Sequence, residues 1–81
     1  MNLFIDEKEL KYLPITIDPG IVSGVPVFKG TRVPVETLLT NLEDGLSLDK
    51  FLQNYPTVTR QQAIQVLEFS KSTLLMLAKS A

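Results

Sequence analysis

Arg60 and three glutamines, Gln61, Gln62 and Gln65, stand close together where the sequence predicts the start of a helix. An arginine guanidinium can donate two hydrogen bonds to the edge of a guanine, and a glutamine amide pairs in a similar way with adenine. These residue types at the amino end of a helix are typical of a recognition helix in the major groove of DNA. The pattern predicts a base-reading surface. The alternative is a solvated helix face, because glutamine has good helix propensity.

Four further side chains are candidates for phosphate contacts. Lys29 and Arg32 flank a predicted tight turn, and Thr57 and Thr59 precede the glutamine-rich helix. Contacts to phosphate fix the position of a protein on DNA without reading its sequence. For Lys29 the alternative is simple solvation. For Arg32 it is an ion pair inside the domain with a carboxylate such as Glu36.

The chain of 81 residues contains no cysteine and no histidine. Disulfides and thiolate metal sites are therefore excluded, and the commonest metal ligand and general base are missing. Glu43, Asp44 and Asp49 are neighbours in sequence, but they straddle a predicted helix end and a helix cap, where solvation accounts for them. We expect no catalytic residues, no metal site and no cofactor, so recognition is favoured over an enzymatic role.

The net charge of −1 gives no support for nucleic-acid binding by itself, because affinity for phosphate comes mainly from clustered lysine and arginine. Residues 29–32 and residues 60–79 each carry a net +2 within an otherwise acidic chain. No apolar run approaches the roughly 20 residues that span a bilayer. The amino terminus lacks the basic region of a secretion signal, so we expect a cytoplasmic protein without a membrane segment.

The amino-terminal half of the chain predicts short strands and turns. Asp6 followed by Glu9 has capping-box spacing and predicts a helical turn over 7–12. Residues 15–17 alternate as a strand does and end at the turn residues 18–20. Residues 25–28 and 31–33 predict a hairpin closed by Lys29 and Gly30. Pro26 places its strand at a sheet edge, open to a second copy or another protein, or stands at the start of the strand.

Three helices are predicted in the second half, over residues 35–44, 48–55 and 60–79. Gly45 is placed to end the first helix in a left-handed conformation, and Ser47 to cap the second. Thr59 and Gln62 have the spacing of a capping box at the start of the third. The second and third helices, joined by a short turn, have the length and order of a helix-turn-helix.

The last helix carries two apolar faces, which is more than a small core needs. Val66, Phe69 and Leu77 mark the second face. This face packs either within its own domain or on a partner. A chain of this length buries only ~60% of the surface that its unfolded form exposes, so its core is marginal. We therefore expect a partner or a second copy, and a homodimer in particular.

Several segments between Ile15 and Phe69 together form a recognisable signature. They are Ile17 to Gly20, Gly24 to Val35 with its Gly-Thr-Arg and Val-Pro-Val runs, Asp44-Gly45, and Tyr55 to Thr59. The signature resembles family 433 among the domains of unknown function, a group of small bacterial and archaeal helix-turn-helix proteins. The resemblance implies a winged-helix-like fold. It also implies an antitoxin-like role for some members, which bind and silence a PIN-type ribonuclease and repress their own operon.

The sequence thus predicts one mostly α domain over residues 1–81. Residues 1–14 form an amino-terminal segment, residues 15–33 the strands and hairpin, and residues 35–79 three helices. The leading hypothesis is a DNA-binding, antitoxin-like transcriptional regulator that binds its own operator. The alternative is a protein-interaction module that binds and silences a PIN-type ribonuclease, or another partner, without binding DNA.

Overall fold

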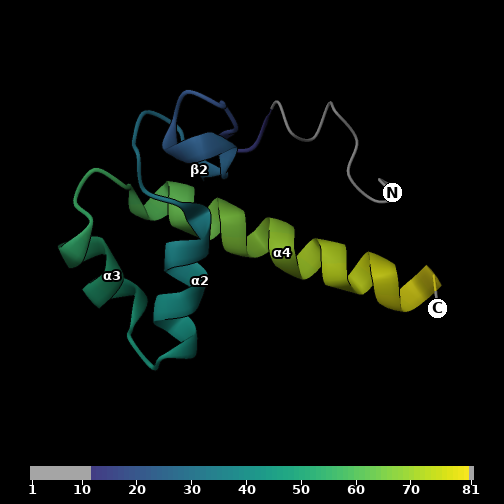
Figure 1. Ribbon diagram of the computed structural model, residues 1–81. Coiled ribbons are helices and arrows are strands. Elements are labelled where there is room, and N and C mark those ends of the chain that lie inside the picture. Colours follow the sequence, from purple (N-terminus) through teal and green to yellow (C-terminus); the bar gives the residue numbers. More distant parts are fainter. Residues whose placement is uncertain (1–11, 81) are drawn as a thin grey trace.

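Three helices and a two-stranded sheet make up the fold in the computed structural model, which describes residues 12–80 (Figure 1). The expected class, mostly helical with a small amino-terminal β-structure, is confirmed. The elements in chain order are β1 (Ile15–Thr16), the short 3-10 turn η1 (Val22–Gly24), β2 (Val27–Phe28), α2 (Val35–Glu43), α3 (Leu48–Asn54) and α4 (Arg60–Ser80). The helical turn predicted over 7–12 lies outside the described residues, apart from Tyr12.

The sheet pairs β1 with β2 in antiparallel fashion, with Ile15 opposite Phe28. The strand expected at 15–17 is confirmed over its first two residues, and the turn at 18–20 follows it. There the backbone N–H of Ile21 donates to the carbonyl of Asp18 over 2.9 Å. The Asp18 carboxylate accepts a second hydrogen bond from Gly20 N–H over 2.8 Å. The aspartate therefore closes the turn with both its main chain and its side chain.

The predicted hairpin turn is present, but its second arm is shorter than expected. Thr31 N–H donates to the carbonyl of Phe28 over 3.0 Å, and Gly30 adopts a positive φ of 78°. Beyond the turn, the arm is reduced to one bridge between Val27 and Pro34. Because β1 occupies the other side of β2, this strand has neighbours on both sides. Of the two alternatives for Pro26, an open edge available to a second copy is therefore wrong, and a position at the start of the strand is confirmed, because Pro26 comes directly before Val27.

The helices begin and end within one residue of the predicted positions. The hydroxyl of Ser47 accepts a hydrogen bond from Lys50 N–H over 3.1 Å and caps α3. At the start of α4, Thr59 Oγ1 accepts from Gln62 N–H over 3.1 Å, and Gln62 Oε1 accepts from Thr59 N–H over 3.0 Å. This reciprocal pair is the capping box that the spacing of the two residues predicts.

Gly45 ends α2 in the left-handed conformation, with φ of 90°. Leu46 N–H donates to the carbonyl of Asn41, and Gly45 N–H donates to that of Leu42, both over 3.0 Å, which is the Schellman pattern. We expect Gly45→Ala to lower the free energy of unfolding by about 1 kcal/mol, because a Cβ is strained at this φ. Urea unfolding followed by circular dichroism measures this. The exposed control Glu43→Ala is expected to change stability by less than ~0.5 kcal/mol.

A single core joins the hairpin to all three helices. Phe28, Leu38 and Phe51 are fully buried, and the remaining buried residues of this cluster are Val58, Ala63 and Val66. The rings of Phe28 and Phe51 lie 6.2 Å apart between their centroids. Only the first two turns of α4 contribute to this core. The carboxy-terminal half of α4, called its outer half below, runs away from the sheet, α2 and α3 (Figure 1).

Candidate nucleic-acid interface

The corner between α3 and α4 is held from inside the domain. Tyr55 N–H donates to the carbonyl of Phe51 over 2.9 Å, and Val58 N–H donates to that of Tyr55 over 3.0 Å. The side chain of Val58 is buried in the core. These bonds form a tight turn between the two helices, while the first residues of α4 remain at the surface. The amino end of α4 is thus presented outward on a fixed support.

Two of the four predicted base-reading residues lie free on the outer face of α4. Gln61 and Gln65 are exposed, one turn apart on the same side of the helix. Ile64 lies between them and is 43% exposed, while Ala63 and Val66 point into the core. A face with two glutamine amides and an aliphatic side chain matches the groups that contact adenine edges and thymine methyl groups.

Gln62 does not belong to this face, and the expectation that it reads a base is corrected. Its Oε1 accepts from Thr59 N–H, and its Nε2 donates to the main-chain carbonyl of Lys29 over 3.1 Å. Both ends of the amide are therefore used inside the protein. The capping-box spacing predicted the first of these bonds. The second joins residues 33 positions apart, and no local sequence pattern indicates it.

Arg60 is exposed, and its guanidinium forms an ion pair with the Asp49 carboxylate on α3. The side chains of Arg60 and Asp49 are 56% and 73% exposed, and pairs this open contribute little to stability. Arg60 can therefore exchange Asp49 for another acceptor at small cost. Among the described residues the other ion pair joins Lys71 to Glu68, so the pair between Arg32 and Glu36 does not form.

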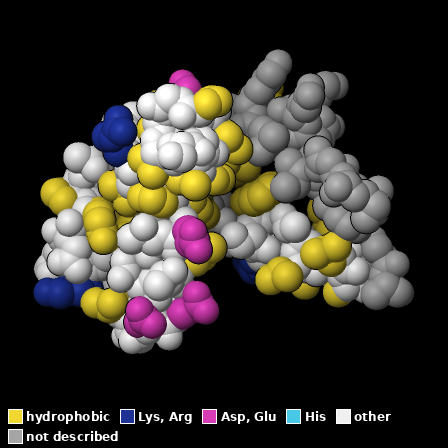
Figure 2. Space-filling view, in the orientation of Figure 1, with side chains coloured by type: hydrophobic (Ala, Val, Ile, Leu, Met, Phe, Trp, Pro, Cys, Tyr) yellow, Lys and Arg dark blue, Asp and Glu magenta, His cyan; other side chains and the backbone are white. Residues whose placement is uncertain are grey.

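The hydrogen bond from Gln62 to Lys29 brings the hairpin turn beside the amino end of α4. Lys29 is exposed there, so a predicted phosphate ligand lies next to the predicted base-reading helix. Thr57 and Thr59 are also exposed, in the turn that leads into α4. Arg32 is exposed in the segment that follows the hairpin turn. Figure 2 shows lysine and arginine side chains (dark blue) standing apart rather than in one continuous patch.

The three residues expected at a partner interface differ in their surroundings. Val66 is only 5% exposed and belongs to the protein's own core, so its assignment to an exposed second face is corrected. The reason is that Ala63 and Val66 form the inward side of the first two turns of α4. Phe69 is half-buried, whereas Leu77 is exposed on the outer half of the helix.

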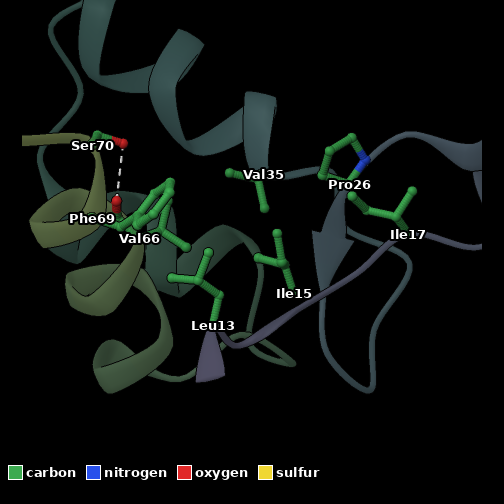
Figure 3. A pocket seen from close by; sticks show the side chains of 8 residues that line it. All are labelled: Leu13, Ile15, Ile17, Pro26, Val35, Val66, Phe69 and Ser70. Carbon is green, nitrogen blue, oxygen red and sulfur yellow. Dashed lines mark hydrogen bonds between the residues drawn. The ribbon is translucent and has the colours of Figure 1, made fainter. Parts of the chain in front are cut away.

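Phe69 lines a cavity of about 250 Å³ between α4 and the sheet (Figure 3). The side chains of Leu13, Ile15 and Val35 point toward those of Val66 and Phe69. The full lining is Leu13, Ile15, Ile17, Pro26, Val35, Val66, Phe69 and Ser70. Seven of these eight residues are apolar, and the Ser70 hydroxyl donates to the carbonyl of Val66 over 2.9 Å. The lining of the cavity is therefore almost entirely apolar, which suits an apolar occupant.

The described residues contain no group of three acidic residues that could hold a metal ion. Over the same part of the chain, no helix has the length and hydropathy needed to cross a membrane.

The fold and the corner define a small helical domain with a helix-turn-helix arrangement. Residues 15–70 match the family described as "Protein of unknown function (DUF433)", and the chain belongs to this family. The match covers both strands, α2, α3 and the first half of α4.

Two further proteins are similar to the chain, one in sequence and one in fold. The uncharacterized protein y4eO of Sinorhizobium fredii is 33% identical over 48 residues, which are 59% of this chain and 22% of y4eO. The chain thus spans about a fifth of that relative. A crystal structure of a DUF433 member from Anabaena variabilis superposes with a TM-score of 0.66 at 24% identity, over 91% of this chain and 73% of that one. This similarity supports the fold.

Proposed function

We propose that the protein is a DNA-binding, antitoxin-like transcriptional regulator of the cytoplasm that acts as a homodimer. The observation that carries the proposal is the outward amino end of α4, where Gln61 and Gln65 are exposed beside Arg60. In a helix-turn-helix protein this end of the second helix contacts the bases. Its fixed support by the core meets the need for a rigid recognition helix.

Phosphate contacts are supported by what surrounds this end of the helix. Lys29 is brought to it by the hairpin, and Thr57 lies in the preceding turn. A helix amino terminus also carries a positive partial charge that favours phosphate. The described residues 12–80 hold six basic and six acidic side chains, so overall attraction to DNA is weak. Binding therefore depends on these local contacts.

The direct test is binding to the DNA upstream of the protein's own gene, measured by gel shift and fluorescence anisotropy. We expect micromolar or tighter binding that weakens as salt rises, since each neutralised phosphate releases a counterion. A scrambled duplex of the same length is the control, and it is expected to bind at least ~1,000-fold more weakly, the lower bound for specific sites. Absence of salt-dependent binding by the folded wild type at micromolar protein would reject the proposal.

The second candidate function is a protein-interaction module that docks a PIN-type ribonuclease or another partner without binding DNA. The exposed leucines in the second half of α4, Leu74, Leu75 and Leu77, and the apolar cavity favour it, because apolar surface of this kind marks interaction sites. Co-purification with the product of the adjacent gene separates the two functions. A free-standing repressor binds DNA without that product, whereas the module needs it.

A further inference from the structure

The main chain of Lys29 is held from two directions. The hairpin turn is closed by the bond from Thr31 N–H to the Phe28 carbonyl, which does not use the carbonyl of Lys29. The N–H of Lys29 donates to the carbonyl of Pro14, just before β1, over 2.8 Å. Its carbonyl accepts from Gln62 Nε2 on α4 over 3.1 Å. Two different segments of the chain therefore hold the two polar main-chain groups of this residue.

The amide of Gln62 uses both of its ends at this position. Thr59 N–H can only donate and the Lys29 carbonyl can only accept, so one side chain must offer an acceptor to the first and a donor to the second. A glutamate would complete the capping box equally well and would gain from the positive partial charge at the start of the helix. It has no donor for the hairpin when it is ionised. The glutamine is thus explained by the contact with the hairpin and not by the cap alone.

The side chain of Lys29 can meet a phosphate from this fixed main chain. It is exposed, and neither ion pair in the described part of the chain uses it. The core holds Phe28 at the base of the turn, but a Cβ on Gly30 would meet no atom within 4 Å, so the tip has open space around it. The bond from Gln62 therefore ties this tip to the helix.

We propose that Gln62 is a positioning residue, whose amide holds the hairpin turn against the amino end of α4 and so fixes the place of Lys29 there. Its role in phosphate binding rests on the proposed function, whereas its hold on the hairpin does not. One side chain then joins the helix that reads bases to the turn that carries a phosphate ligand. The spacing between these two parts of the proposed DNA-binding surface stays constant, as a preorganised site requires.

The hold on the hairpin is tested without DNA, by NMR of the full chain. The side-chain amide hydrogens of Gln62 are expected to exchange with solvent roughly 2- to 12-fold more slowly than those of Gln61, which is the protection that one hydrogen bond of ordinary net strength gives. In Gln62→Glu, the backbone order parameters of residues 29–31 are expected to fall from about 0.85, typical of rigid backbone, toward about 0.6. Equal exchange of the two glutamines, or unchanged order parameters in the variant, overturns the proposal.

Two control variants separate this hold from the cap and from added charge. Thr59→Ala removes the hydroxyl that accepts from Gln62 N–H, so it weakens the start of α4 but is expected to leave the order parameters of residues 29–31 near their wild-type values. Gln61→Glu adds the same charge on an exposed neighbour and should also leave them unchanged. Circular dichroism establishes that each variant is folded. A control that loosens the hairpin as much as Gln62→Glu does would assign the effect to the cap or to the charge and reject the proposal.

The salt dependence of DNA binding tests whether Gln62 acts through Lys29. Lys29→Ala is expected to reduce the slope of log K against log salt by about 1, the share of one phosphate contact. Gln62→Glu should reduce it by a similar amount, and by little more in a Lys29→Ala background, because the contact that it positions is already lost. A full further reduction in that background would mean that the new carboxylate repels DNA directly, which overturns the positioning role. A wild type that binds no DNA would reject the proposed function, while the NMR comparison still decides whether Gln62 holds the hairpin.

Discussion

Phe51→Ala is expected to remove most of the stability of this domain. The Phe51 ring is fully buried between the ring of Phe28 in β2, 6.2 Å away, and that of Tyr55, 5.0 Å away at the corner before α4. Truncating a buried phenylalanine costs about 3–5 kcal/mol, since transfer free energy is lost and a cavity remains. The free energy of unfolding of a typical domain is only about 5–15 kcal/mol, and that of a small domain lies near the lower end of this range.

Urea unfolding at equal protein concentration measures this loss. Gln53→Ala is the matched control, because it truncates an exposed side chain on the same helix and is expected to change stability by less than ~0.5 kcal/mol. A cost below about 1 kcal/mol for Phe51→Ala would mean that the corner does not depend on this ring. The amino end of α4 would then be supported by contacts other than those of the Phe51 ring.

The local signals of the sequence account for the helices and for much of the corner. Each residue that starts or ends a helix forms its hydrogen bonds within five residues along the chain, so its role follows from spacing alone. These residues are Ser47, Gly45, and the pair Thr59 and Gln62. Such caps set the boundaries of a helix, which is why the helix ends lie within one residue of the positions that the sequence predicts. The turn at Asp18 follows from the same kind of local chemistry.

Long-range contacts explain what spacing could not predict. The strand β2 pairs with β1, where Val27 lies opposite Thr16, eleven residues earlier in the chain. The choice of that partner depends on packing. The bond from Gln62 to the Lys29 carbonyl and the pair of Arg60 with Asp49 join elements that a linear pattern does not connect. The cavity also collects Leu13 and Pro26 from separate segments, so its apolar lining becomes visible only in three dimensions.

Under the proposed function, Arg60→Ala is expected to weaken binding to the operator by roughly 10- to 100-fold, which corresponds to about 1–3 kcal/mol for the loss of a bidentate base contact. The loss should fall on one base position, so a set of duplexes with single substitutions identifies it. At that position the variant is expected to lose its preference for one base, while it still discriminates between bases at the other positions. An equal loss of affinity for every duplex would instead mean that Arg60 contacts a phosphate and not a base.

Asp49→Asn is expected to act in the opposite direction. The Asp49 carboxylate holds the guanidinium of Arg60 in the free protein and would repel a nearby phosphate. Exposed pairs contribute about 0.2–1 kcal/mol, so releasing Arg60 should tighten binding by up to about fivefold. Glu43→Gln removes one negative charge at the end of α2 and is the control for a general effect of charge. In an Arg60→Ala background the gain from Asp49→Asn should shrink to that of Glu43→Gln, because no guanidinium remains to be released.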